Sequence, residues 1–302
     1  MPIDFPKNFP TIEEMLSIMQ KTIEKSWKIE MDTDDINLWL SNFTGKCYDK
    51  EDERRIALWL LCNYTYYNSD DVNHLCKILH RKFVHELITK QDLTGSTQIK
   101  ELLKSVCFSA IGSASESGGL LLYHYRQEAD ISIDRFFYPS SVEALSENIL
   151  VFIDDVTISG GTAVRFFYKN LKHIKNKNIY YLAIISSEDA VKKLTDLGIN
   201  VVSCYLFDER NKCFSDSSMI FHKFPEIREA AKNISETYGD MIAEKAYRLG
   251  YKNSECCFGF YYNTPNNTLP IFWSTDNWTP IFPRKEKLQN AREIPYETRR
   301  YI

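Results

Sequence analysis

The stretch ILVFIDDVTISGGTAVRFF, residues 149–167, constrains the fold of this chain more than any other segment. An apolar run, residues 149–153, ends in two adjacent acids, Asp154 and Asp155, and a turn of small and hydroxyl residues separates it from a second apolar run. The first run predicts a strand that is buried on both faces, and the second predicts a helix. Open α/β sheets bind ligands at the carboxyl ends of their strands, where the strand-to-helix loops lie, so this turn is a candidate ligand site.

Strands and helices alternate through the middle of the chain. Apolar runs at 106–112, 178–185 and 199–207 predict further strands, and residues 187–198 predict a capped helix that Gly198 ends. These strands are too apolar to face water on either side. We therefore expect an α/β fold with a parallel sheet that helices cover on both faces.

The two ends of the chain have a different character. Residues 1–104 predict helices, because apolar residues recur there at helical spacing. Residues 251–302 include a segment rich in aromatic residues, proline and asparagine, for which we expect a strand and a structured loop. We therefore divide the chain into a helical extension, 1–104, and an α/β domain, 105–302, that includes this last segment.

Composition excludes several classes of protein. Of the 302 residues, 44% are hydrophobic, which is enough for a sizeable core. The net charge of -4 gives no overall attraction to nucleic acid, although a local basic patch is allowed. No apolar run approaches the length of a membrane span, and the first residues lack the pattern of a secretory signal. The eight cysteines form no Cys-x-x-Cys pair, which is typical of reduced thiols in a cytoplasmic protein.

The turn after the strand has the chemistry of a phosphate site. Gly160 and Gly161 let the backbone approach a ligand closely, and amides at the start of the next helix can donate to a phosphate. Ser159 and Thr162 add hydroxyl donors. The two acids upstream can accept hydrogen bonds from a vicinal diol and can lie near a magnesium ion that the ligand holds. Diol, phosphate and metal together describe a ribose 5-phosphate.

This segment resembles the signature of type I phosphoribosyltransferases, in which four apolar residues and two acids precede a short phosphate loop. The resemblance implies that Asp154 and Asp155 bind the ribose hydroxyls. It also implies that the loop 157–162 binds the 5-phosphate of phosphoribosyl pyrophosphate, through Thr157, Ser159, Gly160, Gly161 and Thr162. An earlier loop in these enzymes holds pyrophosphate, and here it corresponds to Gly112, Ser113, Ala114, Ser115, Ser117 and Gly118.

The ends of the chain are similar to one branch of this family, the bacterial phosphoribosyltransferase-like proteins of conflict and phage-defence loci. The likeness lies in the segments INLWLSNF and DERRIALWLLCNYTYY, and in NTPNNTLPIFW near the other end. It implies that 251–302 form a hood over the sugar, with Asn263, Asn267 and Trp273 as contacts to a base or other acceptor. Packing and turn chemistry are the alternative roles for these three residues.

The catalytic half of the site departs from the family pattern, and two functions stay open. Ile158 stands where some purine-salvage members place an aspartate that acts as general base, and no lysine lies between Lys104 and Lys169. The first function is an enzyme that acts on phosphoribosyl pyrophosphate or a nucleotide at the anomeric carbon, which in phage defence would be a toxic effector. The second is an inactive sensor of the same ligands that regulates a protein or nucleic-acid partner. No residue is assigned as catalytic acid or base.

The resemblance also sets expectations for cofactor and partners. It implies magnesium carried by the ligand, with no metal ligand from the protein itself. The small-molecule partner is phosphoribosyl pyrophosphate or a nucleotide. A partner protein or nucleic acid from a defence locus and a homo-oligomer are both left open, and we expect no association with a membrane. The sequence identifies neither the acceptor nor the direction of the reaction.

Overall fold

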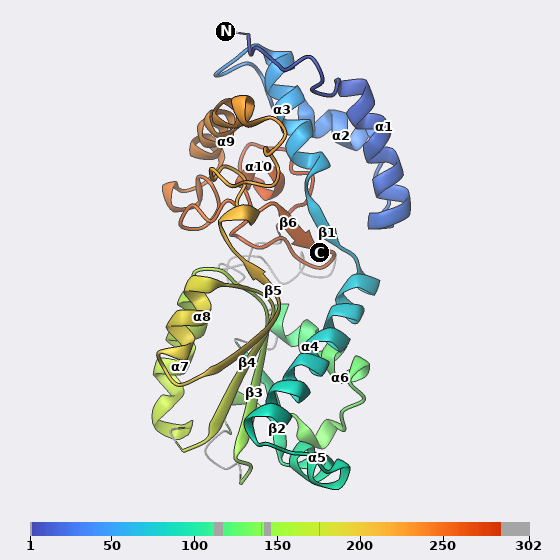
Figure 1. Ribbon diagram of the computed structural model, residues 1–302. Helices are drawn as coiled ribbons and strands as arrows, with labels where there is room; N and C mark the ends of the chain where they lie inside the picture. The colour runs from blue at the N-terminus through green and yellow to red at the C-terminus, as the bar shows by residue number, and fades with distance from the viewer. Residues whose placement is uncertain (1, 112–116, 140, 142–145, 175, 285–302) are drawn as a thin grey trace, which may run out of the picture.

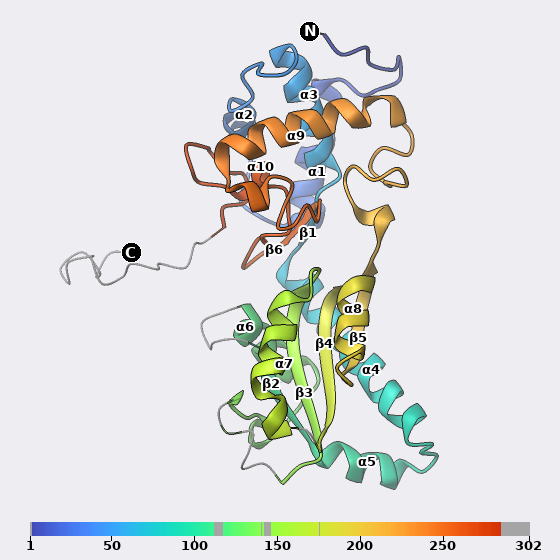
Figure 2. The same cartoon turned by 90° about the vertical axis from the view of Figure 1, so that its left-hand side faces the viewer.

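The computed structural model describes residues 2–111, 117–139, 141, 146–174 and 176–284 and arranges them in two lobes, one above the other in Figure 1. The lower lobe is built around a four-stranded sheet, and the upper lobe brings together helices from both ends of the chain (Figures 1 and 2). The backbone of Ser117 and of residues 171–173 is described without their side chains.

All four strands of the large sheet run parallel, as the apolar runs predict. Their order is that of the sequence: β2 (Val106–Ala110), β3 (Ile149–Thr157), β4 (Asn178–Ser187) and β5 (Asn200–Phe207). Strands β2, β3 and β4 are buried over most of their length, as a sheet covered on both faces requires. The expectation that every strand is shielded from water is wrong for β5, which lies at the edge of the sheet and exposes Tyr205 and Leu206. The predicted α/β class with a parallel sheet flanked by helices is confirmed.

Different helices cover the two faces of this sheet. One core cluster joins β3 to α7 (Gly161–Ile174) and α8 (Glu188–Thr195), and another joins it to α4 (Ser69–Lys90) and α6 (Ser117–Glu128). Successive side chains of a strand point to opposite faces, so Leu150 and Phe152 enter the first cluster while Val151 and Ile153 enter the second. Figure 2 shows α7 and α8 in front of the sheet.

The chain changes direction between β2 and β3. From β2 it passes through α6 to a bridge between Phe136 and Phe108, at the edge of β2 that does not face β3. The Phe137 amide donates to the Phe108 carbonyl at 3.0 Å. From β3 the chain passes through α7, on the other face, to β4. The carboxyl ends of β2 and β3 therefore lie at a topological switch point, which is where open α/β sheets bind ligands.

The upper lobe combines the two ends of the chain. Its core cluster draws buried side chains from residues 9–64 and from residues 213–282. Its helices are α1 (Ile12–Thr22), α2 (Thr33–Leu40), α3 (Lys50–Cys62), α9 (Arg228–Ile242) and α10 (Pro270–Trp273). The strands β1 (Thr65–Tyr67) and β6 (Phe258–Phe260) pair in parallel within it. The division at residue 104 stays a prediction, and the packing adds that α4 lies on the sheet while residues before 65 lie on the C-terminal part.

Shorter elements connect these parts. Helix α5 (Ser96–Lys104) leads into β2. A π-helical turn covers Ile23–Trp27, and 3₁₀ turns in the described part of the chain include Ile133–Arg135, Glu209–Asn211, Pro225–Ile227 and Lys245–Tyr247.

A buried carboxylate organises the upper lobe. Glu53 of α3 is fully buried, and it accepts hydrogen bonds from the amides of Gly45 at 2.7 Å, Cys47 at 2.7 Å and Tyr48 at 3.1 Å. The Tyr238 hydroxyl of α9 is a fourth donor. A buried charge is tolerated when it is surrounded by donors in this way. Glu53 thus joins α3, the loop before it and α9.

We expect Glu53→Ala to lower the free energy of unfolding by about 3 kcal/mol or more, because three amides and a hydroxyl lose their buried acceptor. The measurement is urea unfolding followed by circular dichroism. Glu51→Ala on the same helix is the matched control, since Glu51 is exposed and its pair with Arg54 should contribute little. Equal losses in the two variants would contradict this role of Glu53.

Candidate functional site

Both acids lie within β3 instead of following it. The predicted strand ends at residue 153, whereas the observed strand continues to Thr157, so this part of the prediction is wrong. The physical reason is that β4 also extends to Ser187, and Asp154 and Thr157 pair with Ala183 and Ser186. The ladder therefore carries the acids to the carboxyl edge of the sheet.

Asp154 is held by neutral donors on the α7 face of the sheet. Its Oδ2 accepts from the Tyr181 hydroxyl of β4 at 2.9 Å, and its Oδ1 accepts from the Asp155 amide at 3.0 Å. Burial, and next the neighbouring Asp155 carboxylate, raise the pKa of Asp154 well above its ordinary value of 3.8, although the Tyr181 hydrogen bond opposes the shift. The carboxylate is therefore short of positive or strongly donating partners.

Asp155 is buried and turns to the opposite face. Its Oδ1 accepts from the Val156 amide at 2.8 Å, and its Oδ2 lies 3.4 Å from the Tyr262 hydroxyl of the upper lobe. This second contact is long for a hydrogen bond between two oxygens. Each acid thus bonds the amide of the next residue, so both side chains lean forward along β3 toward the carboxyl edge.

The loop after β3 is shorter than predicted. Thr157 is the last residue of β3 and is buried, and α7 begins at Gly161, so the connection is residues 158–160. Gly160 has a φ of +70°, and an added Cβ would lie 3.3 Å from the Ala190 Cα of α8. The Gly161 amide donates to the Ser159 hydroxyl at 3.3 Å, at the point where α7 begins. The amides that follow Gly161 in the first turn of α7 have no acceptor within their own helix, so they can donate to a ligand.

One further predicted contact of the phosphate loop, Thr162, and the base of the loop at Ile158 can be placed. Thr162 is exposed in the first turn of α7, where its hydroxyl is open to solvent. The carbonyl of Ile158 accepts from the Ser187 hydroxyl at 2.5 Å, and that hydroxyl also accepts from the Ala190 amide at 3.0 Å. The N-terminal cap of α8 therefore fixes the base of the loop. A phosphate-binding role for the loop stays a prediction.

A lysine that the sequence does not associate with the loop lies beside it. Lys193 of α8 donates to the Ser159 carbonyl at 3.0 Å and also pairs with Asp189. The segment between Lys104 and Lys169 has no lysine, yet the fold supplies one from the next helix. The sequence signal that could have drawn attention to Lys193 is its i,i+4 spacing from Asp189 on a helix. That spacing is equally typical of an ordinary surface ion pair.

Most of the predicted pyrophosphate loop, Gly112, Ser113, Ala114 and Ser115, lies outside the described residues. Ser117 begins α6, and Gly118 is buried behind it. A Cβ on Gly118 would lie 2.9 Å from the carbonyl oxygen of Ile111 and 3.6 Å from that of Ile153. Gly118 therefore lets α6 start directly against the ends of β2 and β3, next to the acids.

The predicted hood contacts make hydrogen bonds within the upper lobe. Asn267 is buried, and its amide group donates to the Ser254 hydroxyl at 3.0 Å. The Trp273 indole donates to the Thr268 carbonyl at 2.7 Å. Asn263 closes a turn over residues 260–263, since its backbone exchanges hydrogen bonds of 2.9 and 3.0 Å with that of Phe260. A role for these three residues at an acceptor stays a prediction.

The tip of that turn carries the two tyrosines that reach the sheet. The Tyr262 hydroxyl lies by Asp155, as described above, and the Tyr261 hydroxyl lies 2.6 Å from Nε2 of His124 on α6. Sequence reasoning missed Tyr262 and His124. The only signal was the pair of tyrosines before Asn263 in an aromatic segment, which does not identify a partner more than 100 residues away.

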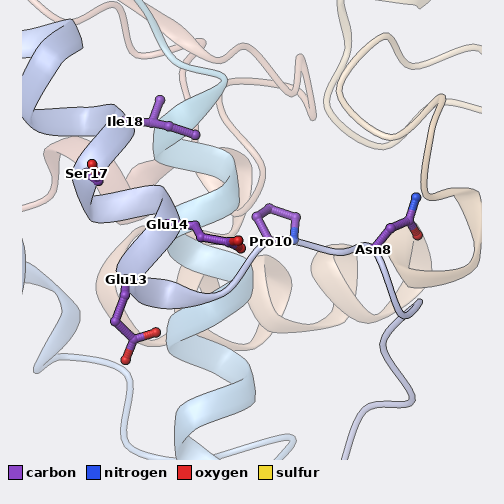
Figure 3. Close-up of a pocket in the computed structure, with 6 residues that line it drawn as sticks. All are labelled: Asn8, Pro10, Glu13, Glu14, Ser17 and Ile18. Atoms are coloured by element: carbon purple, nitrogen blue, oxygen red, sulfur yellow. The ribbon is translucent and has the colours of Figure 1, made fainter.

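Two hollows of the described surface lie elsewhere. The larger, of about 690 Å³, is on the upper lobe; Figure 3 shows it beside α1 and the segment before it, lined by Asn8, Pro10, Glu13, Glu14, Ser17 and Ile18. The second, of about 460 Å³, lies between α4 and β5. Neither includes the acids or the loop after β3.

Within the described part of the chain, no cluster of three or more His, Cys, Asp or Glu side chains is arranged to hold a metal ion. Over the same residues, no helix has the length and apolar character that crossing a membrane requires.

The family comparison places the chain among the phosphoribosyltransferase-like proteins. The model of the PRTase-CE family matches residues 36–284, which is most of the chain, and the protein belongs to that family. No curated protein matches the chain. A solved structure that is similar in part is the orotate phosphoribosyltransferase from Aeropyrum pernix, with 15% identity and a TM-score of 0.25. The match covers 33% of this chain and 58% of that enzyme's chain.

The raised pKa of Asp154 predicts a pH-dependent stability. The folded state keeps a proton that the unfolded chain releases above about pH 4, so this residue's contribution is present below that pH and is lost as the pH rises toward the folded-state pKa. Asp154→Asn removes the ionisation, so we expect the variant to gain stability relative to wild type between pH 4 and pH 7. Urea unfolding at both values measures this. A difference that stays the same at pH 4 and pH 7 would contradict the shift.

Gly160→Ala should cost more stability than Gly198→Ala. Both glycines have positive φ, +70° and +79°, so alanine adds backbone strain of about 1–2 kcal/mol at either site. At Gly198 nothing lies within 4 Å of the added Cβ, whereas at Gly160 the backbone of Ala190 lies 3.3 Å away. Thermal unfolding of the two variants measures the difference. Equal losses would show that the loop does not pack on α8 as described.

Proposed function

We propose that the protein binds phosphoribosyl pyrophosphate with magnesium, or a nucleotide in the reverse direction, and acts at the anomeric carbon of the sugar. The observation that carries this proposal is the position of Asp154 and Asp155. They lie at the switch point of a parallel sheet, directly before a glycine loop and a helix N-terminus. The membership of the PRTase-CE family supports the same class of ligand.

The residues of the site would have separate tasks. The two acids would accept hydrogen bonds from the 2- and 3-hydroxyls of ribose, since each carboxylate oxygen can accept more than one hydrogen bond. The amides of 159–162 would hold the 5-phosphate, and the first turn of α7 favours its negative charge. Held at both ends, the sugar would keep its anomeric carbon in one position, which is the main contribution that fixed geometry makes to such a transfer.

The donor set fits magnesium carried by the ligand. Carboxylate oxygens are the ligands that magnesium prefers, and Asp154 has a raised pKa that a nearby cation would lower. When bound, magnesium would neutralise the charge on the pyrophosphate. Asp154 and Asp155 are the residues that would lie near it.

A sensor without turnover is the second candidate function, and one observation favours it. Ile158, which takes the place of the general base of some purine-salvage members, is buried in the core cluster beneath α4 and α6. No proton transfer is available from an aliphatic side chain. In this case the upper lobe, which contacts Asp155 through Tyr262, would present the bound state to a partner protein or nucleic acid.

The biological setting that we propose follows from the family likeness alone. In a phage-defence locus, turnover would deplete or modify nucleotides, so that the protein would be a toxin held in check by partners. Binding without turnover would instead report the nucleotide level.

Calorimetric titration with phosphoribosyl pyrophosphate and magnesium tests the site. We expect wild type to bind and Asp154→Asn/Asp155→Asn to bind at least about 100-fold more weakly, because two charge-assisted hydrogen bonds are lost. Asp34→Asn, at an exposed aspartate of α2, is the control and should bind as wild type does. Wild-type binding that the double variant retains would reject the assignment of the two acids.

An assay for released pyrophosphate in the same samples separates the two functions. Release by wild type and not by the double variant would select the enzyme. Binding without release of pyrophosphate or of a free base from a nucleotide would select the sensor.

A further inference from the structure

We propose that His124 and Tyr261 form a tether that seats Tyr262 against Asp155, which makes His124 and both tyrosines positioning residues for the sugar site. This inference rests on the proposed function in one respect, because it takes Asp155 as a ligand of the sugar. It assigns a task to residues of the upper lobe and of α6 that neither the sequence motif nor the family likeness singles out.

Two hydrogen bonds at His124 connect α6 to the upper lobe and to α4. The Tyr261 hydroxyl and His124 Nε2 are 2.6 Å apart, and His124 Nδ1 is 2.7 Å from Asn73 Oδ1 on α4. Because the asparagine oxygen can only accept, Nδ1 carries the proton, and Nε2 then accepts from the tyrosine. Burial lowers the pKa of His124, while Glu128, itself paired with Lys77 at 2.9 Å, opposes that shift. The neutral imidazole is the form that fits both partners.

The turn transmits this position to Tyr262. Two backbone hydrogen bonds between Phe260 and Asn263 close it, and the Tyr261 amide donates to the Tyr67 carbonyl of β1 at 2.9 Å. The Tyr262 ring also stacks on that of Phe260, with ring centres 5.5 Å apart and an angle of 14°. These contacts join Tyr261 and Tyr262 in one closed turn, so a shift of Tyr261 would be passed to Tyr262, whose ring also packs against the core cluster of the sheet.

The contact at Asp155 is the part that depends on this placement. At 3.4 Å, the Tyr262 hydroxyl lies at the limit of hydrogen bonding, so a small displacement of the turn makes or breaks the bond. When made, the bond holds Oδ2 of Asp155 in one position, and with it the carboxylate that would meet the sugar. The Tyr262 hydroxyl then couples the upper lobe to the sugar site.

The protein contains a matched control for the tether. His80 of α4 and Tyr125 of α6 form a second histidine–tyrosine pair, with 2.9 Å between Nδ1 and the hydroxyl, inside the lower lobe. Tyr261→Phe and Tyr125→Phe each remove one hydroxyl from such a pair. Only the first of these pairs touches the upper lobe.

Hydrogen exchange without ligand tests the tether directly. We expect Tyr261→Phe to speed amide exchange in residues 258–264 by about 5-fold, the equivalent of one hydrogen bond, and Tyr125→Phe to leave that segment unchanged. Unchanged exchange in Tyr261→Phe would overturn the tether. Equal acceleration in both variants would overturn it as well, since it would reflect general loosening.

Affinity for phosphoribosyl pyrophosphate with magnesium tests the positioning role. We expect Tyr261→Phe and Tyr262→Phe each to weaken binding by about 3- to 10-fold, and the double variant to be no weaker than Tyr262→Phe alone, because both act through one bond. Multiplied effects, or no effect of Tyr262→Phe, would overturn the role. A wild type that does not bind the probe would reject the proposed function, and the exchange experiment would still decide the tether.

Discussion

Two adjacent carboxylates at the end of β3 place the strongest physical demand on the structure. Asp155 is buried, and burial together with the neighbouring Asp155 carboxylate raises the pKa of Asp154. The donors to these carboxylates include the Tyr181 hydroxyl on one face of the sheet, the Tyr262 hydroxyl on the other and two backbone amides. A ligand that brings hydroxyl donors or a cation relieves the remaining cost, so the electrostatics of the free protein already favour such a ligand.

The arrangement of the lobes gives this site a second set of neighbours. The parallel pairing of β1 with β6 brings the C-terminal segment back beside the first helices, and the turn after β6 then reaches the sheet. The proposed sugar-phosphate part of the site is thus formed by one local stretch of sequence. The residues that reach Asp155 from the upper lobe are instead placed by pairing between the two ends of the chain.

The sequence predicts the parallel sheet and the strand–loop–helix at residues 149–174 well, because buried strands and their glycine turns have strong local patterns. It misplaces the end of β3, since that end is set by pairing with β4, which the local pattern does not contain. It misses Lys193, His124 and Tyr262 for the same reason: each meets the site across a long stretch of sequence. The aromatic, proline and asparagine-rich segment predicts a structured loop. Its Asn267 and Trp273 side chains make hydrogen bonds within the upper lobe.

A crystal structure of the protein with bound ribose 5-phosphate would test the central claim most directly. The account predicts that the phosphate lies on the amides of 159–162 and that the two ring hydroxyls lie within hydrogen-bond distance of Asp154 and Asp155. A ligand bound at another surface, away from these carboxylates, would contradict it.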